Sequence, residues 1–118
     1  MRATSVNPIL NVSDFAASVA WFQRLGWEES WAWDDPPTFG AVRSGDVEVF
    51  LCQGAQGAPG VWMSVWVDDV DAVYRHCQQA GIEIAQPPGG EPWGVREMHV
   101  VHPDRHVFRI SQRYPHRH

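Results

Sequence analysis

The chain contains no lysine, and its nine basic residues are arginines distributed from Arg2 to Arg117. Aspartate and glutamate together number 14, which leaves a formal net charge of -5 at pH 7. Nucleic-acid-binding domains usually concentrate positive charge on one face or along one helix. Because the arginines form no such basic stripe, we expect no DNA or RNA partner.

Long apolar runs are also missing. Crossing a bilayer takes roughly 20 consecutive apolar residues, and no window of this sequence approaches that length. The first residues, from Met1 to Ser5, lead directly into a strand-like run without the apolar core of a signal peptide. We therefore expect a cytoplasmic protein with no membrane partner.

Cysteine is scarce, with Cys52 and Cys77 as the two examples. They do not form the closely spaced pair that is typical of a zinc site, and cytoplasmic thiols stay reduced. We expect both to be small buried residues without a disulfide or metal role.

What the sequence does contain is an internal repeat. Residues 10–28 match residues 65–83 in pattern when the chain is shifted against itself. A chain of 118 residues that is 44% hydrophobic can bury one sizeable core. We predict a single domain, 1–118, of two repeated modules at about 5–53 and 61–112, joined by a flexible segment of small residues.

Each copy of the repeat predicts a strand, a helix and three further strands. The helices are expected to begin after the caps Ser13 and Asp68, which can accept backbone N–H bonds, and to end at Gly26 and Gly81, which tolerate the left-handed conformation. Apolar residues recur along one face of each helix, which indicates packing on a sheet. The later strands are predicted at 27–34, 39–43 and 47–52 in the first module, and at 82–85, 95–101 and 106–111 in the second.

Several stretches together resemble a known family. They are Leu10-Asn-Val-Ser-Asp-Phe15, Trp21-Phe-Gln-Arg-Leu-Gly26, Val67-Asp-Asp-Val-Asp-Ala72, and Pro92-Trp-Gly-Val-Arg-Glu97 followed by His102-Pro-Asp104. In order and spacing they resemble the vicinal oxygen chelate superfamily, which includes glyoxalase I, extradiol dioxygenases and bleomycin resistance proteins. The last pair is most similar to the bleomycin-resistance-like branch, with Arg105 where that branch usually has glycine.

The resemblance implies an α+β fold. Its two βαβββ modules would form curved mixed sheets around a cleft, with the helices outside. Many members of the family dimerise, so a homodimer is expected.

Metal-dependent members of the family take four ligands from the first and last strands of their modules. The matching positions here hold Asn7, Phe50, Trp62 and Arg109. Phenylalanine and tryptophan rings cannot ligate a divalent cation, and arginine carries a permanent positive charge. The resemblance therefore implies no metal and no other cofactor at these positions.

The segment 96–110 is nevertheless rich in histidine. Glu97 and His99 share a strand face, whereas His102 and His106 flank a turn and are expected to be solvated. Without a convincing third ligand we expect no metal here. An unconventional site around Glu97 and His99 is kept as the alternative.

Strand alternation, anchored on the former ligand positions, predicts which side chains face the cleft. The alternate positions, among them Pro8, Leu10, Val47 and Val49, would lie beneath the helices. Aromatic walls with a few polar groups suit a planar organic ligand, and the two glutamates would favour a positive charge on it. The predicted ligand-binding residues are Asn7, Glu48, Phe50, Trp62, Trp66, Glu97, His99 and Arg109.

Some of these assignments have structural alternatives. Trp62 and Trp66 could fill a closed interior instead of contacting a ligand. Arg109 could form a structural ion pair with Glu48 or Glu97.

The predicted strand 27–34 carries a further aromatic pattern. Trp27, Trp31 and Trp33 alternate with a period of two and predict one aromatic strip. Such a strip fits the mouth of a pocket or a dimer seam.

These observations favour a non-enzymatic protein that binds and sequesters a planar, antibiotic-like small molecule, and no catalytic residue is assigned. The first alternative is a metal-dependent lyase or dioxygenase of the glyoxalase type, with ligands around Glu97 and His99. The second is an orphan domain whose cleft is filled by its own side chains.

Overall fold

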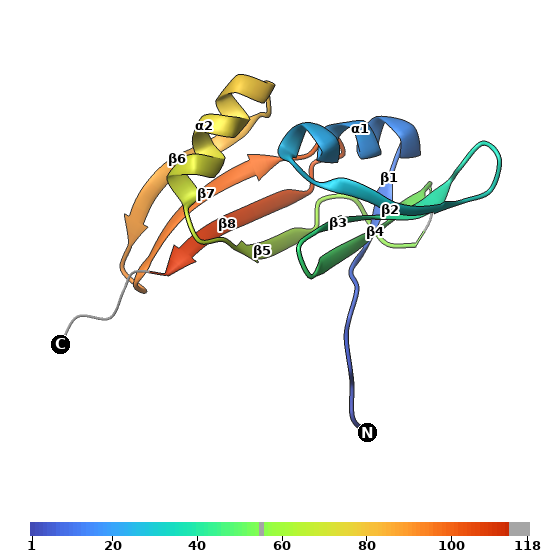
Figure 1. The fold of residues 1–118 in the computed structure, drawn as a ribbon, viewed down its shortest axis with the longest axis horizontal. Helices are drawn as coiled ribbons and strands as arrows, with labels where there is room; N and C mark the ends of the chain where they lie inside the picture. Colours follow the sequence, from blue (N-terminus) through green and yellow to red (C-terminus); the bar gives the residue numbers. More distant parts are fainter. Residues whose placement is uncertain (55, 114–118) are drawn as a thin grey trace. The chain divides into compact units, whose positions relative to one another are not determined.

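The computed structural model describes residues 1–54 and 56–113. The chain divides between Pro59 and Gly60 into two compact units, and each has the order strand, helix, three strands (Figure 1). The predicted α+β class and the two βαβββ modules are confirmed. The elements are β1 (Ile9–Val12), α1 (Phe15–Leu25), β2 (Glu28–Trp33), β3 (Phe39–Ser44), β4 (Val47–Gln53), β5 (Trp62–Trp66), α2 (Val70–Ala80), β6 (Ile84–Glu91), β7 (Val95–Val101) and β8 (Val107–Arg113).

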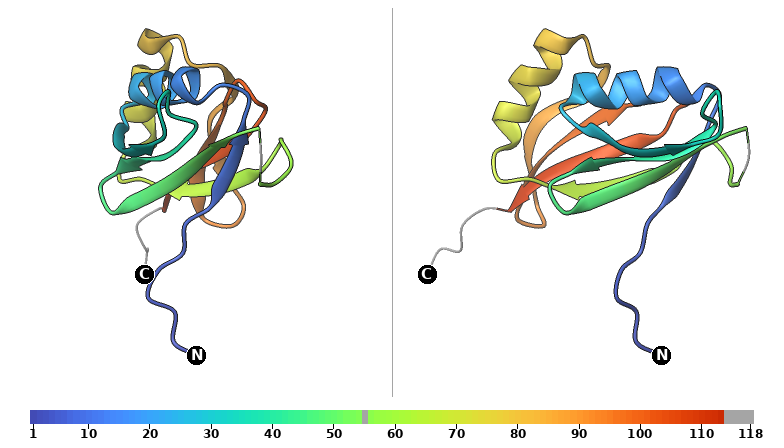
Figure 2. Two further views of the ribbon diagram at one scale, coloured as in Figure 1. Left: turned by 90° about the vertical axis from the view of Figure 1, so that its right-hand side faces the viewer. Right: turned by 45° about the vertical axis from the view of Figure 1, so that its right-hand side comes forward.

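Unit 1 is a four-stranded mixed sheet in the order β1-β4-β3-β2. β1 runs parallel to β4, with Ile9 opposite Phe50, and the other neighbours are antiparallel. Helix α1 lies along one face of this sheet (Figure 2). Its apolar side packs on every second residue of the strands, which gives a core of Leu10, Val12, Phe15, Phe22, Val42, Val49 and Leu51.

Unit 2 repeats this arrangement in the order β5-β8-β7-β6, with β5 parallel to β8. Helix α2 covers one face, where the core consists of Val70, Cys77, Met98, Val100, Phe108 and Ile110. Arg96 of β7 donates two hydrogen bonds of 2.9 Å to the Asp71 carboxylate in the first turn of α2. This fork joins the helix to the sheet, and the Arg96 guanidinium lowers the pKa of Asp71.

The helix ends follow the predicted chemistry, but the starts are displaced by one residue. Asp14 and Asp69 are the caps, and their carboxylates accept from the backbone N–H of Ala17 and Ala72. The predicted caps, Ser13 and Asp68, were wrong because each is followed by an aspartate that can reach the same N–H group. Gly26 and Gly81 end the helices in the left-handed conformation, as predicted.

At 11 residues each, neither helix of the described chain is long and apolar enough to cross a membrane.

The strand β6 is longer than predicted and includes the Pro87-Pro88-Gly89-Gly90 segment, which lies between the predicted strands 82–85 and 95–101. β6 lies at the edge of its sheet, where proline is tolerated because one side of the strand has no partner. The pairing register with β7 shifts between Gln86 and Gly89, which places the two prolines in the irregular part of the strand.

The predicted alternation of side chains holds in the middle of the strands and fails at their starts. Leu10, Val49 and Leu51 are buried beneath α1, whereas Val47 is 48% exposed and Pro8 is also exposed. Pro8 precedes β1 and Val47 is the first residue of β4.

Candidate ligand-binding site

In each unit the helix packs on one face of the sheet, and we call the opposite face the helix-free face. On unit 2 the strand register defines this face, because residues directly opposite each other share it. Trp62 is opposite Val107, Trp66 is opposite Ser111, and His99 is opposite Arg109. The predicted ligand-binding residues of β5 and β8, Trp62, Trp66 and Arg109, lie on this face together with Ser64, Val107 and Ser111.

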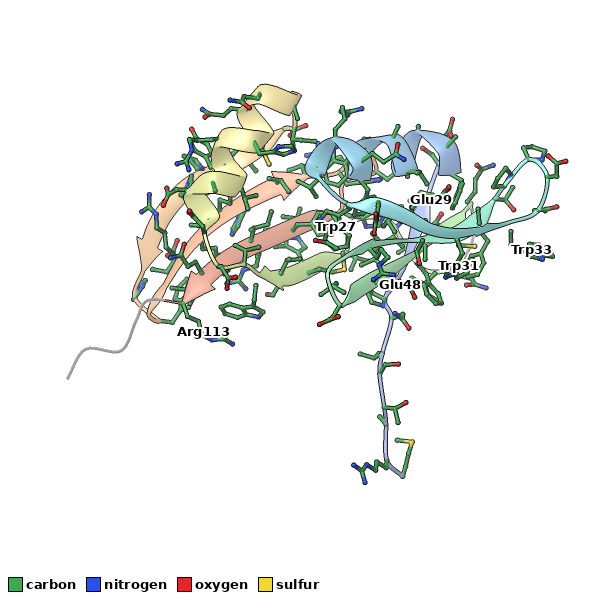
Figure 3. The ribbon with its side chains drawn as sticks, in the orientation of Figure 1. Trp27, Glu29, Trp31, Trp33, Glu48 and Arg113 are labelled. Atoms are coloured by element: carbon green, nitrogen blue, oxygen red, sulfur yellow. The ribbon has the colours of Figure 1, made fainter. Side chains whose placement is uncertain are left out.

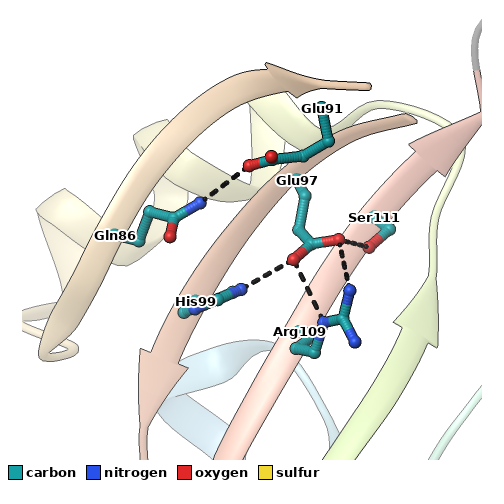
Figure 4. Close-up of polar contacts among 6 residues, drawn as sticks. All are labelled: Gln86, Glu91, Glu97, His99, Arg109 and Ser111. Atoms are coloured by element: carbon teal, nitrogen blue, oxygen red, sulfur yellow. Dashed lines mark hydrogen bonds and ion pairs between the residues drawn. The ribbon is translucent and has the colours of Figure 1, made fainter. Parts of the chain in front are cut away.

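The polar centre of this face is the buried carboxylate of Glu97 (Figure 4). Its Oε2 accepts from Arg109 Nε at 3.0 Å and lies 2.7 Å from His99 Nε2. Its Oε1 accepts from Arg109 Nη2 at 3.1 Å and from Ser111 Oγ at 3.2 Å. Strands β7 and β8 bring these four side chains together because Glu97 pairs with Ser111 and His99 pairs with Arg109 in the ladder.

The hydrogen bonds determine the charge of this carboxylate. Burial alone would raise the pKa of Glu97, but the hydrogen bonds from Arg109, His99 and Ser111, with the charge of Arg109, lower it to about 2. The same contact with Glu97 raises the pKa of Arg109. The pair is therefore ionised across the physiological range.

Glu97 is consequently occupied by its own neighbours. Each of its oxygens has two polar contacts, so it does not offer the free negative charge that the sequence suggested for a cationic ligand. Of the two partners considered for Arg109, the structure pairs it with Glu97. What the network presents to a ligand is the outer part of the His99 ring and the Arg109 guanidinium, whose side chains are 16% and 37% exposed.

Three exposed tryptophans surround this network. Trp62 is 59% exposed, and the His99 ring meets it edge to face at a centroid distance of 5.4 Å. Trp66 is 49% exposed, with the Arg113 guanidinium 3.9 Å from its ring centroid. Trp93, in the β6–β7 turn, lies 5.9 Å from the Arg109 guanidinium. Other side chains of unit 2 therefore leave the rings of Trp62 and Trp66 largely uncovered.

On unit 1 the helix-free face carries an aromatic cluster. Trp31, Phe39 and Phe50 meet edge to face, with ring centroids 5.2 to 5.9 Å apart. The strand register places them together, because Trp31 and Phe50 both lie opposite Ala41. Edge-to-face contacts of this kind stabilise by about 1 kcal/mol each beyond the area they bury.

The side chains of the two polar residues predicted on unit 1, Asn7 and Glu48, each form a hydrogen bond within the unit. Asn7 donates from Nδ2 to the carbonyl oxygen of Glu48 at 3.0 Å, which extends the β1–β4 pairing by one contact. Ser30 Oγ donates to Glu48 Oε2 at 2.5 Å. Asn7 and Glu48 therefore share one neighbourhood with Phe50, as predicted, but each already has a partner within the unit.

A bulge in β2 separates the tryptophans that the sequence placed in one strip (Figure 3). The register shifts between Glu29 and Trp31, so Ser30 is the extra residue. Trp27 packs on Phe22 of α1 at 5.4 Å, on the helix side of the sheet. Trp31 belongs to the helix-free face, and the prediction of a single strip was wrong.

The two histidines expected to be solvated are fully buried. His102 and His106 have no exposed surface, and their ring centroids are 5.4 Å apart. His102 Nδ1 accepts from the backbone N–H of Asp104, and His106 Nδ1 accepts from that of Val61. The expectation failed because these rings replace missing backbone partners around the β7–β8 turn, where Arg105 takes a left-handed φ of 71°.

Burial also determines the charge of His102. It lowers the pKa of His102 to about 4, the nearby His106 acts in the same direction, and Asp104 opposes both. A neutral ring is required because Nδ1 serves as a hydrogen-bond acceptor.

Comparison with known proteins identifies the family. A model of the glyoxalase/bleomycin resistance protein/dioxygenase superfamily matches residues 4–110. The chain belongs to this superfamily. A search of curated proteins finds none that matches it.

Solved structures of the superfamily share this fold. A bleomycin resistance determinant encoded on the transposon Tn5 has a TM-score of 0.80 and 23% identity, with 96% of this chain and 100% of that chain covered. A bleomycin-binding protein in complex with bleomycin has a TM-score of 0.78 and 24% identity, covering 95% and 100%. A glyoxalase-related enzyme from Clostridium phytofermentans has a TM-score of 0.82 and 21% identity, covering 97% and 98%.

The residues at the positions where metal-dependent members of the superfamily hold their ligands do not fit a divalent cation. Asn7 directs its amide nitrogen to Glu48, Arg109 holds a fork with Glu97, and Phe50 and Trp62 present rings. The described residues include no group of three or more histidine, cysteine or acidic side chains placed to hold a metal.

Three residues of the helix-free face were missed by the sequence interpretation as contacts. Ser111 and Trp93 are not among the predicted ligand-binding residues. Arg113 follows Arg109 and Ser111 at the same spacing of two, so extending the alternation by one step would have found it.

Proposed function

We propose that this member of the superfamily is a non-enzymatic binding protein that sequesters a planar, antibiotic-like aromatic molecule. The observation that carries the proposal is the pair of half-exposed indoles, Trp62 and Trp66, on the helix-free face of unit 2. Aromatic side chains bury large areas and stack on flat ligands. Binding alone would lower the free concentration of the ligand, and no bond need be broken.

The surroundings of the two indoles support this function. The His99 ring is edge-on to Trp62, and the Arg113 guanidinium lies against Trp66. Side chains that are already restrained lose less conformational entropy when a ligand binds. The Glu97 network in turn fixes His99 and Arg109, which would orient polar groups of the ligand.

The likeness to structures named for bleomycin resistance and bleomycin binding supports a small-molecule ligand of the antibiotic type. On unit 1, Phe50 with Trp31 provides a second aromatic surface. Asn7 and Glu48 border it and would supply polar contacts.

Calorimetric titration with a panel of planar antibiotics, bleomycin included, tests the proposal. We expect saturable binding of at least one compound, which chromatography then recovers unchanged after prolonged incubation. A panel without any saturable binding would contradict the proposed function, and so would conversion of the bound compound.

A metal-dependent lyase or dioxygenase is the alternative. The observation that favours it is the similarity to a glyoxalase-related enzyme. Elemental analysis of the purified protein separates the two functions. Stoichiometric zinc, nickel, manganese or iron would support the enzyme and overturn the binding-only role.

We further infer a homodimer in the cytoplasm. Trp33, on the edge strand β2, is 66% exposed, and aromatic side chains are enriched in interface cores. Sedimentation analysis of the native chain and of Trp33→Ser tests the dimer, since the variant should shift toward monomer. Cell fractionation tests the location.

A further inference from the structure

Arg113 is the last residue of β8 (Figure 3). Its guanidinium lies 3.9 Å from the centroid of the Trp66 ring. The residue is exposed. Within residues 1–54 and 56–113 it forms no ion pair, and its stacking contact uses the face of the guanidinium. Stacking leaves the N–H groups at the edge of this planar cation available as donors.

The other charged groups of β6, β7 and β8 on this face already have hydrogen-bond partners within the unit. Arg109 is held by both oxygens of Glu97, and Glu91 Oε1 accepts from the Gln86 amide at 3.2 Å. Arg113 is therefore the cation of this face whose charge is not balanced by a contacting carboxylate in the described chain.

A pocket of about 220 Å³ opens beside this stacked pair. It is lined by Trp66, Val67, Asp68, Gln112 and Arg113. Gln112 uses its carbonyl oxygen to accept from the backbone N–H of Val70, so its amide nitrogen is the remaining polar atom of that side chain. The volume is below the roughly 300 Å³ of pockets that enclose whole drug-sized molecules, and it suits one polar group of a ligand.

We propose that this pocket receives a carboxylate carried by the aromatic ligand, with Arg113 as the group that binds it. A planar guanidinium pairs with a carboxylate through two parallel hydrogen bonds. Trp66 holds the guanidinium in place and offers the neighbouring surface for the ligand ring. The inference rests on the proposed binding function and adds the charge of the ligand, which is opposite to the charge suggested by the glutamates in the sequence.

Asp68 should weaken the preference of the pocket for a carboxylate. It is the acidic residue of the pocket lining and forms no ion pair with Arg113. Its charge would repel a bound carboxylate, so removing that charge should strengthen binding. Asp68 and Arg113 therefore provide two variants with opposite expected effects.

The test is calorimetric titration of the full chain, in low salt at neutral pH, with three probes that share one ring system. These are 2-naphthoate, the neutral 2-naphthamide and the cationic 2-naphthylmethylammonium. We expect the carboxylate to bind about tenfold more tightly than the amide, as one charge-assisted contact implies, and the ammonium to bind most weakly.

The variants locate the preference. Arg113→Gln should bring the affinity for naphthoate to the affinity that the same variant shows for the amide. Asp68→Asn should increase the affinity for naphthoate by a few fold. Arg2→Gln removes the same charge from the exposed N-terminal segment and should leave the preference intact.

The outcomes distinguish this inference from the function on which it rests. Equal binding of all three probes would overturn the carboxylate site and leave ring capture standing. A carboxylate preference that survives Arg113→Gln would also overturn it. If neither the probes nor the planar antibiotics bind, both the function and this inference fail.

Discussion

The carboxylate of Glu97 and the guanidinium of Arg109 face each other across β7 and β8 as a two-point ion pair, with N–O distances of 3.0 and 3.1 Å. The Glu97 side chain is 4% exposed, whereas the Arg109 side chain is 37% exposed. The carboxylate therefore loses more of its hydration on folding than the guanidinium does, at a cost in free energy. The contacts of Glu97 with His99 and Ser111 help to offset this cost.

Replacing Glu97 with glutamine should destabilise the fold by about 2 kcal/mol. The variant removes the negative charge that the four contacts stabilise and leaves the Arg109 guanidinium without its ion-pair partner. Urea denaturation at neutral pH measures the change in the free energy of unfolding. Glu83→Gln is the matched control, since Glu83 is 62% exposed and lies 3.7 Å from Arg105. That change should cost less than about 0.5 kcal/mol, and equal losses in the two variants would contradict the buried role of Glu97.

Stability should fall as the pH drops below the ordinary pKa of histidine. The pKa of His102 is about 4 in the folded chain against 6.5 in the unfolded chain, so between these values the unfolded state binds more protons. The stabilisation is complete above pH 6.5 and is lost progressively as the pH falls toward 4. We expect a loss of about 2 kcal/mol between pH 7.5 and pH 5, measured by urea denaturation.

A variant should flatten this pH dependence. In His102→Asn, the side-chain oxygen can accept from the Asp104 N–H as the imidazole does, but it does not titrate. His76→Gln, on the exposed side of α2, should keep the native slope. An unchanged slope in His102→Asn would assign the pH dependence to other groups.

Glu97 contributes to the pH dependence of stability at lower pH. Its pKa is about 2 in the folded chain against 4.5 in the unfolded chain, so its stabilisation is lost as the pH falls from 4.5 toward 2.

Gly40→Ala should be among the most damaging small substitutions. A Cβ at this position would collide with the carbonyl oxygen of Trp31 and lie 2.7 Å from Phe15 Cζ. Because a backbone oxygen cannot simply rotate away, we expect a loss of about 3 kcal/mol. Gly89→Ala, where no atom lies within 4 Å of the added Cβ, is the control. A melting temperature that is the same for both variants would show that β2 shifts easily.

Trp62→Ala should weaken a stacked ligand by about 1–3 kcal/mol if this indole is a binding anchor. Trp62→Phe should retain most of the affinity, because it keeps a ring that can stack. Titration calorimetry gives both values for the compound that binds in the antibiotic panel. Native affinity in a folded Trp62→Ala protein would remove this residue from the site.

Much of the fold follows from local patterns in the sequence. The internal repeat, the glycines that end the helices and the apolar alternation were sufficient to predict two βαβββ modules. The caps shifted because Ser13-Asp14 and Asp68-Asp69 each offer two adjacent candidates, and a pattern does not show which oxygen reaches the N–H group.

The remaining differences arise from contacts between strands. Ser30 is an extra residue in β2. It interrupts the alternation, so Glu29 and Trp31, which are two positions apart, face opposite sides of the sheet, and simple alternation does not predict this change. The partners of Glu97 lie two, 12 and 14 residues away, and its charge environment became visible only when β7 and β8 were paired. The hydrogen-bond partner of His106 Nδ1 is similarly remote in sequence, because it is the backbone N–H of Val61, 45 positions away.

The proline pair in β6 has a consequence for assembly. Proline has no N–H group, so a strand of another molecule that paired with β6, the edge strand of this sheet, would lack hydrogen-bond donors at Pro87 and Pro88. The outer margin of the second sheet is thus protected against edge-to-edge polymerisation, and contact there would depend on side chains.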